Sequence, residues 1–246
     1  MGPREFYDEL PSTQDRALEL ARSGAEDGTR VVASRQSRGR GRADHLWSSP
    51  DGGLYVSIVL KAVPGPVPFL PLGIGATLAR TLGEAYALPL RTKWPNDVLL
   101  PARGAVARKL AGILVDEIPS PNLGRAWVVG VGVNVLAPPG GYPSDLLRPA
   151  TSLSELTSPA PTLAEVERLV VDSCLQTRRT LEREDGATVM LRHCRALLYG
   201  VGCRVVVDGR PAGRISGLAD DGALEVGTEG APTWVRSGDV AIQEEA

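Results

Sequence analysis

The segment that starts at residue 93 reads Lys93-Trp94-Pro95-Asn96-Asp97 and runs into Val98-Leu99-Leu100. The short apolar run predicts a β-strand. Pro95 fixes the backbone before it and Trp94 supplies a large apolar anchor, so that Asn96 and Asp97 project polar groups from the strand edge. A tight turn in which Asn96 and Asp97 cap their own backbone explains the same pattern, and Lys93 taken alone is typical of a solvated charge. The segment is therefore a candidate site at the edge of a predicted sheet.

Apolar runs on both sides of this segment predict the rest of the sheet. Residues 54–60 predict a strand with Leu54, Val56, Ile58 and Leu60 on one face, and apolar runs also cover 110–115 and 127–135. Between them, a helical pattern repeats at four-residue spacing, with Ile74, Leu78 and Leu82. A loop is expected from Pro101 to Arg108. These elements predict an α+β fold, with a mixed or antiparallel sheet and helices on one side.

The two ends of the chain differ in character. Ser12-Thr13 precede a helical pattern, a strand follows over 30–34, and residues 35–53 are expected to form a long loop. A surface connection over 136–161 leads to a capping-box pattern that begins at Thr162. After residue 200, short β-like runs alternate with hairpin signals at Asp208-Gly209 and Asp221-Gly222. We therefore expect a large domain over residues 1–198 and a small barrel-like domain over 199–246.

Composition restricts the function. The 246 residues are 43% hydrophobic and 23% charged, and the formal net charge of −2 argues against a protein that coats nucleic acid. Three cysteines without a C-x-x-C pair, and two histidines, argue against a cysteine-based zinc site or a disulfide framework. The first residues lack an apolar signal core, and no apolar run approaches membrane-spanning length. We expect a cytoplasmic enzyme with no membrane partner.

Glycine and arginine alternate in the segment Gln36-Ser37-Arg38-Gly39-Arg40-Gly41-Arg42, which precedes Trp47. Glycine lets the main chain approach a ligand, and each guanidinium can make paired hydrogen bonds to a carboxylate or phosphate. Such a loop could close over an anion and exclude water from a reactive mixed anhydride. Disordered RNA-binding segments and localisation signals share this composition, so the segment alone leaves these alternatives open.

Three further segments carry candidate residues. Lys109 opens an apolar strand, where its ammonium either snorkels or stabilises transferring oxygens, and Gly112 permits close approach on the same strand. Gly130-Val131-Gly132-Val133-Asn134 lacks the third glycine of a dinucleotide fingerprint and favours a strand packed closely against a ligand or neighbour. Ser12-Thr13-Gln14 is explained by helix capping, although N–H groups there would also suit a polar ligand.

Together these segments resemble the catalytic domain of biotin–protein ligases. The family's glycine-rich loop resembles residues 39–42 with the downstream Trp47, and its Lys-Trp-Pro-Asn-Asp motif is similar to 93–97. Its Lys-x-x-Gly-Ile-Leu and Gly-x-Gly-x-Asn strands are similar to 109–114 and 130–134. The resemblance implies the family's class II synthetase-like α+β fold, with a small SH3-like β-barrel at the C-terminal end.

The resemblance also implies a role for each residue. The implied biotin-binding residues are Ser12, Thr13, Gln14, Gln36, Arg40, Gly41, Arg42, Lys109 and Gly112. The implied ATP or adenylate contacts are Arg42, Trp47, Lys93, Asn96 and Asn134. The implied catalytic residues are Lys109 and Arg40, which hold the biotin carboxylate against the α-phosphate, and Asp97, which orients or deprotonates the incoming lysine.

The expected reaction consumes biotin and ATP with Mg²⁺ and biotinylates a lysine of the biotin carboxyl carrier protein of acetyl-CoA carboxylase or a related carboxylase. Gln14 stands where the family commonly has Asn, and Ala43-Asp44-His45 replaces a Gly-Arg step, so the details of those contacts stay open. With eleven residues before Ser12, we expect no helix-turn-helix region and no DNA partner. We expect a monomer or weak homodimer. The alternatives are a lipoate–protein ligase, or an RNA-binding protein that uses the Arg-Gly loop.

Overall fold

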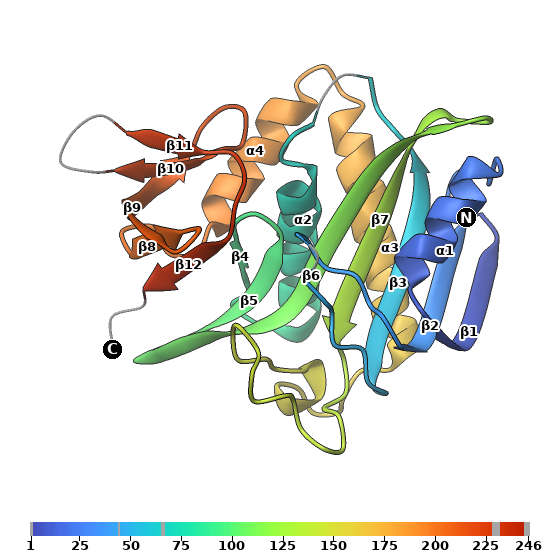
Figure 1. The fold of residues 1–246 in the computed structure, drawn as a ribbon, viewed down its shortest axis with the longest axis horizontal. Helices are drawn as coiled ribbons and strands as arrows, with labels where there is room; N and C mark the ends of the chain where they lie inside the picture. Colours follow the sequence, from blue (N-terminus) through green and yellow to red (C-terminus); the bar gives the residue numbers. More distant parts are fainter. Residues whose placement is uncertain (1, 44, 65–66, 228–231, 244–246) are drawn as a thin grey trace.

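The computed structural model describes residues 2–43, 45–64, 67–227 and 232–243. Its main sheet has seven strands in the order β1-β2-β3-β7-β6-β5-β4 (Figure 1). The pair β1–β2 is parallel, and the other neighbouring strands are antiparallel. The predicted α+β fold with a mixed sheet is therefore confirmed. The strands are β1 (Arg4–Leu10), β2 (Arg30–Gln36), β3 (Gly53–Lys61), β4 (Arg91–Lys93), β5 (Asp97–Ala102), β6 (Ala105–Ser120) and β7 (Gly124–Asn134).

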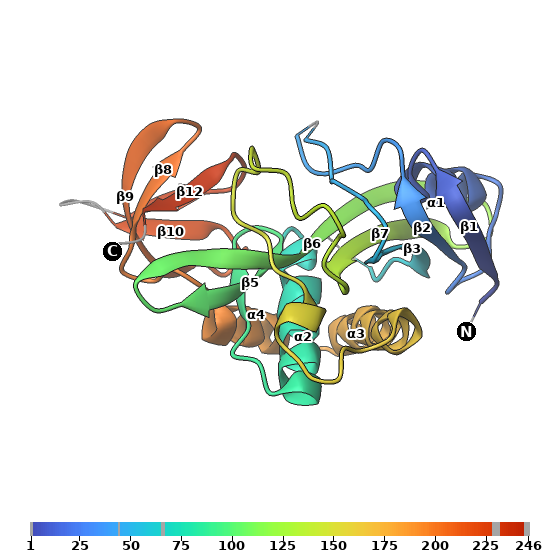
Figure 2. The same cartoon turned by 90° about the horizontal axis from the view of Figure 1, so that it is seen from below.

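Helices cover both faces of this sheet. The helices α2 (Leu70–Tyr86), α3 (Leu163–Leu181) and α4 (Gly186–Leu197) lie on one side, and α1 (Thr13–Arg22) lies on the other (Figure 2). The prediction of helices on one side is wrong, because the apolar stripe of α1, Ala17, Leu18 and Ala21, packs against the opposite face of β2, β3 and β7.

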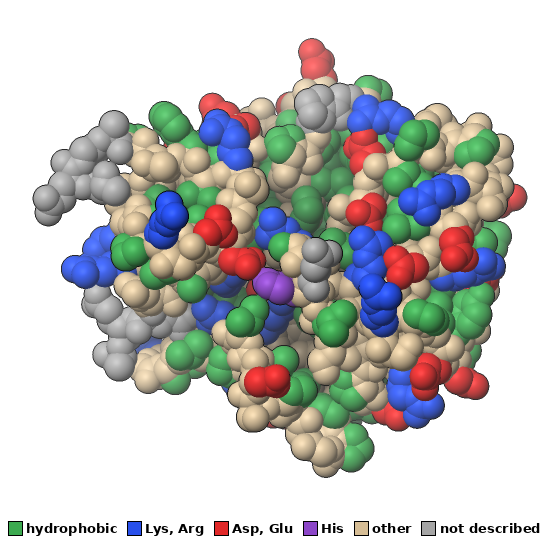
Figure 3. All heavy atoms as spheres, in the orientation of Figure 1, with side chains coloured by type: hydrophobic (Ala, Val, Ile, Leu, Met, Phe, Trp, Pro, Cys, Tyr) green, Lys and Arg blue, Asp and Glu red, His purple; other side chains and the backbone are tan. Residues whose placement is uncertain are grey.

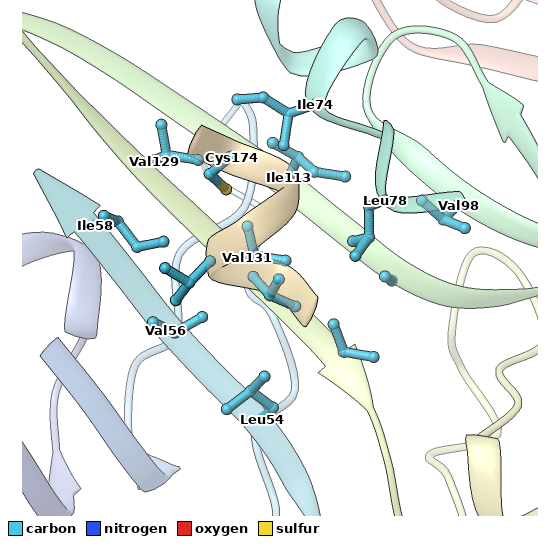
Figure 4. Packing of buried hydrophobic residues seen from close by; sticks show 14 of the residues in the cluster. Leu54, Val56, Ile58, Ile74, Leu78, Val98, Ile113, Val129, Val131 and Cys174 are labelled. Atoms are coloured by element: carbon cyan, nitrogen blue, oxygen red, sulfur yellow. The ribbon is translucent and has the colours of Figure 1, made fainter. Parts of the chain in front are cut away.

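The main core lies between the sheet and the helices α2 and α3 (Figure 4). Alternate residues of β3 face it, as the sequence predicts: Leu54, Val56, Ile58 and Leu60. The intervening residues Tyr55 and Ser57 face the α1 side. This alternation leaves one face of the sheet for packing and the other for a site.

A second, antiparallel sheet occupies the C-terminal end of the chain, with strand order β11-β10-β9-β8-β12. The two predicted hairpins are confirmed: Asp208 and Gly209 adopt positive φ between β8 and β9, and Asp221-Gly222 lies between β9 and β10. The prediction of a domain boundary after residue 198 stays a prediction. The strands are β8 (Arg204–Val207), β9 (Arg210–Leu218), β10 (Leu224–Gly227), β11 (Thr233–Val235) and β12 (Val240–Gln243).

Trp94 connects the two sheets. It is buried in an apolar cluster with residues of α2, α4 and the second sheet, and its Nε1 donates a hydrogen bond to the carbonyl oxygen of Gly222 at 3.1 Å. The prediction of an apolar anchor at this position is confirmed. This anchor fixes the second sheet beside the Lys93–Asp97 segment.

Two loop predictions need correction. The expected loop over 101–108 is a tight turn, because β5 continues to Ala102 and β6 begins at Ala105. The connection over 136–161 is not purely a surface segment, since Thr151, Ser152 and Leu153 are fully buried around the 3-10 helix η1 (Leu153–Glu155). The capping box that begins at Thr162 is confirmed by both of its hydrogen bonds. None of the described helices has both the length and the apolar character needed to cross a membrane.

Candidate active site

A cavity of about 560 Å³ opens on the α1 face of the main sheet. Its walls come from α1, the 37–52 loop, the 135–150 segment and the last strand of the second sheet. Figure 3 shows basic and acidic side chains gathered at the centre of this face, between the two sheets. All the candidate residues except Ser12 line this cavity: Thr13, Gln14, Gln36, Arg40, Gly41, Arg42, Trp47, Lys93, Asn96, Asp97, Lys109, Gly112 and Asn134. Ser12 caps α1, its Oγ accepting a hydrogen bond from the Asp15 backbone N.

Three glycines form the floor of the cavity. Gly112 of β6 and Gly132 of β7 are register partners, and an added Cβ at either would lie within 2.7 Å of the Trp47 ring. A Cβ at Gly130 would lie 2.5 Å from Gln14 Oε1. The glycines therefore let large side chains lie directly on the sheet. The prediction of a strand packed closely against a neighbour is confirmed.

A buried set of hydrogen-bonding side chains forms one end of the cavity. Gln36 Oε1 accepts hydrogen bonds from Thr13 N at 2.8 Å and from Thr13 Oγ1 at 3.1 Å. Ser57 Oγ lies 2.9 Å from Thr13 Oγ1 and donates to Gln14 Oε1 at 3.0 Å. Gln14 Nε2 donates to Asp116 Oδ2 at 3.0 Å. This end therefore has both donors and acceptors that a polar ligand could contact. Two of the side chains, Thr13 and Gln14, are positioned by α1.

Two cations of the cavity pair with carboxylates. Lys109 Nζ lies 2.7 Å from Asp97 Oδ1 and 4.9 Å from the centroid of the Trp47 ring. Arg40 Nη1 lies 3.0 Å from Asp15 Oδ1 and 3.5 Å from Asp116 Oδ2. Both cations are oriented into one cavity, where an anionic ligand could exchange with their carboxylate partners.

The two candidate asparagines connect backbone segments. Asn96 Nδ2 donates to the Ile113 carbonyl at 2.8 Å, and Asn134 Nδ2 donates to the carbonyls of Thr151 at 3.0 Å and Lys109 at 3.3 Å. These bonds fix the strand ends that carry the cations. A nucleotide contact from either asparagine stays a prediction.

The loop over residues 37–52, which carries the alternating glycines and arginines and is called here the Gly-Arg loop, folds back over the cavity. Trp47 N donates to the Gly39 carbonyl at 2.9 Å, and Gly41 N donates to the His45 carbonyl at 2.8 Å. These bonds bring the Trp47 ring onto the glycine floor. Within the part of the chain that the structure describes, the buried Trp47 Nε1 has no hydrogen-bond partner. This indole N–H is therefore an unsatisfied donor against the glycine floor.

Several residues at the cavity were not predicted from the sequence. Arg148 and the Gly238–Ile242 segment line it, although no motif marks them, and Asp116 contacts two of the lining residues, Gln14 and Arg40. Asp239 Oδ2 lies 3.6 Å from His45 Nε2, so the second sheet contacts the Gly-Arg loop. Ser57 carried the one available signal, since it is a polar residue in an otherwise apolar strand.

The chain is similar to known proteins in both sequence and fold. The model of the biotin/lipoate A/B protein ligase family matches residues 7–134. The bifunctional ligase/repressor BirA of Bacillus subtilis is 30% identical over 96% of this chain and 73% of its own length. The biotin–[acetyl-CoA-carboxylase] ligase of Mycobacterium tuberculosis is 32% identical over 93% and 85%. The Aquifex aeolicus biotin protein ligase, solved with biotin and ATP, superposes with a TM-score of 0.81 at 26% identity, covering 100% of both chains.

Proposed function

Because this chain belongs to the biotin/lipoate A/B protein ligase family, we propose that it activates biotin with ATP and transfers it to a lysine of a carrier protein. The observation that carries the proposal is one cavity that joins a buried hydrogen-bonding end to two oriented cations, Lys109 and Arg40. Two of the relatives named above, from Mycobacterium tuberculosis and Aquifex aeolicus, are named as biotin ligases, and the chain shares the Gly-Arg loop and the second sheet expected of a biotin ligase.

The hydrogen-bonding end favours biotin over lipoate. The ureido group of biotin has two N–H donors and a carbonyl acceptor, which match the mixed donors and acceptors of Thr13, Gln14, Gln36 and Ser57. The dithiolane ring of lipoate has neither N–H donors nor a carbonyl acceptor to offer these side chains, so it cannot exchange hydrogen bonds with them.

The cationic end fits the first half-reaction. A biotin carboxylate oxygen attacks the α-phosphate of ATP, the bond to pyrophosphate breaks, and biotinyl-5′-adenylate forms. Negative charge grows on phosphate oxygens, so fixed cations lower the barrier. We assign Lys109 and Arg40 to hold the carboxylate against the α-phosphate, with Arg42 and Trp47 retaining the adenylate under the loop. Lys93, Asn96 and Asn134 lie on the proposed nucleotide side, and Gly41 and Gly112 allow close backbone approach.

Mg²⁺ would accompany ATP. It usually takes one or two carboxylates together with substrate phosphates, and the cavity presents Asp97 and Asp239. Among the described residues, no cluster of three or more His, Cys, Asp or Glu side chains could hold a metal ion, so phosphate oxygens and water would supply most of its ligands. The ion would neutralise charge on the phosphate oxygens.

The second half-reaction needs an orienting group for the incoming amine. The carrier lysine attacks the activated carbonyl and AMP leaves, so no enzyme nucleophile is required. We assign Asp97 to orient or deprotonate that lysine, because its carboxylate lies beside Lys109. The acceptor that we propose is the carrier domain of acetyl-CoA carboxylase or a related carboxylase.

Adenylate formation tests the proposal directly. The protein is incubated with Mg²⁺, ATP and either biotin or lipoate, and the adenylates are identified by mass. We expect biotinyl-adenylate, with pyrophosphate release reduced roughly 10²–10³-fold and biotin binding weakened in Lys109→Ala. The exposed Lys61→Ala is the control. Near-normal pyrophosphate release by Lys109→Ala, or a preference for lipoate, would overturn the assignment.

Several properties of the whole molecule stay proposals. We propose a two-domain division at residues 1–198 and 199–246, a monomer or weak homodimer, a cytoplasmic location, and neither DNA nor membrane as a partner. Limited proteolysis would test the division, and sedimentation with and without biotin would test the oligomeric state.

A further inference from the structure

Arg148 lies at the edge of the proposed nucleotide side, outside every motif of the family. The segment that follows it pairs with β6: Lys109 N donates to the Pro149 carbonyl at 2.7 Å, and Thr151 N donates to the Lys109 carbonyl at 3.0 Å. Arg148 Nη1 donates to the Ala107 carbonyl at 2.9 Å. These bonds hold the guanidinium against β6, close to Lys109 and on the wall of the same cavity.

Lys93 reaches the same wall from β4. Burial lowers the pKa of Lys93, and the positive charges of Arg148 and Lys109 lower it further, while Asp97 and Asp239 oppose the shift. Three cations therefore face this part of the cavity, and the Asp97 carboxylate is already paired with Lys109. Like charges gathered in this way favour a ligand that carries several negative charges.

We propose that Arg148 binds the β- and γ-phosphates of ATP, which leave as pyrophosphate, together with Lys93. This inference rests on the proposed function and deepens it. Lys109 and Arg40 are committed to the carboxylate and the α-phosphate, so the remaining phosphates need further cations. A guanidinium carries five N–H donors in a planar fork, and this geometry can bind two phosphate oxygens at once.

Two substitutions of Arg148 separate the effect of its charge from that of its contact to β6. Arg148→Gln and Arg148→Lys both remove the forked geometry that contacts the Ala107 carbonyl, but only Arg148→Lys keeps the charge. Loss of a hydrogen bond to a charged group corresponds to roughly 10- to 100-fold in affinity. We therefore expect the KM for ATP and the dissociation constant for pyrophosphate to rise by that factor in Arg148→Gln, and by less in Arg148→Lys.

Three measurements on the full chain distinguish a contact to the β- and γ-phosphates from other effects of the substitution. Biotin affinity and inhibition by AMP, which lacks the β- and γ-phosphates, should change less than twofold. Arg168→Gln, on the exposed side of α3, is the matched control and should behave as wild type. Thermal unfolding of each variant checks that it folds.

Two results would overturn the inference. An ATP KM and pyrophosphate affinity within twofold of wild type in Arg148→Gln would exclude a phosphate contact. An increased KM for the carrier protein alone would assign Arg148 to carrier recognition instead. Failure of the proposed function would look different, since the wild-type protein itself would then form no biotinyl-adenylate.

Discussion

Gly132→Ala should loosen the Gly-Arg loop without unfolding the protein. A Cβ at position 132 would lie 2.5 Å from Trp47 Cε2 and 2.6 Å from Nε1, closer than atoms in a folded protein tolerate. The β7 backbone is fixed by hydrogen bonds to β3 and β6, whereas Trp47 belongs to a loop. The ring, and the loop with it, must therefore move away from the sheet.

The size of the effect follows from the overlap. Adding a methyl group to a closely packed contact costs about 1–3 kcal/mol. If the loop bears that cost, its docked population falls by roughly 5- to 150-fold relative to the displaced one. We expect biotinyl-adenylate to dissociate faster by a comparable factor, because Trp47 and Arg42 no longer cover it. The free energy of unfolding should change by less than the loop equilibrium, since the loop can move aside.

The assay is the release of radiolabelled biotinyl-adenylate from the purified protein, measured beside urea unfolding. Gly140→Ala is the matched control, because no atom lies within 4 Å of the added Cβ. The double variant with Trp47→Ala separates the overlap from other effects, since the alanine at 132 should then have little further consequence. Adenylate retention equal to wild type in Gly132→Ala would refute the reasoning.

Three further predictions follow from contacts elsewhere in the molecule. Asp239→Asn weakens the exposed contact with His45, worth about 0.2–1 kcal/mol, so adenylate release should quicken by roughly 1.4- to 5-fold; release at the wild-type rate would contradict this role. Trp94→Phe loses a buried hydrogen bond to the β9–β10 turn, and its urea midpoint should fall by an amount equivalent to about 1 kcal/mol, so an unchanged midpoint would count against the anchor. Glu167 accepts hydrogen bonds from Arg4 and Arg30, and the bond from Arg4 lowers the pKa of its carboxyl most strongly. The contribution of Glu167 to the free energy of unfolding is therefore fully present above the ordinary carboxyl pKa, and it is lost as the pH falls through the lowered pKa of the folded protein. Glu167→Gln should be less stable at pH 7, and its unfolding free energy should fall less steeply below about pH 4 than that of wild type.

The elements that the sequence predicts have strong local patterns. The apolar run from Leu54 to Leu60 indicates a strand regardless of its neighbours, and the capping box at Thr162 fixes a helix start through bonds within four residues. β1 (Arg4–Leu10) gives no such signal, because this edge strand is largely exposed and rich in charge. The N-cap residue of α4, Asp185, makes no side-chain hydrogen bond to the helix, so the start of α4 at Gly186 also gives no sequence signal. Local signals therefore predict the centre of the fold better than its edges.

The candidate site divides in the same way. Residues within motifs, such as Lys109 and Asp97, could be found because their types and spacing are distinctive. Asp239 could not, because it reaches the cavity through packing of the second sheet, and Asp116 could not, because strand register places its carboxylate beside Gln14 and Arg40. Arg148 could not be predicted as a cavity residue either, because its position depends on the pairing of residues 149–151 with β6. Residue type and motif spacing therefore predict the reactive side chains more readily than the residues that surround them in the cavity.

The ion pairs of the cavity suggest how the two half-reactions could be linked. Lys109 pairs with Asp97, and Arg40 pairs with Asp15 and Asp116, so each cation is already oriented by a carboxylate. In the proposed mechanism, the biotin carboxylate and the α-phosphate take over Lys109, and Asp97 loses its partner beside the carbonyl that has just been activated. A buried carboxylate without a cation is unfavourable, and the ammonium of a carrier lysine would replace the lost charge. The exchange at Lys109 would therefore prepare Asp97 to receive the lysine only after the first step has begun, which orders the two steps without a separate conformational change.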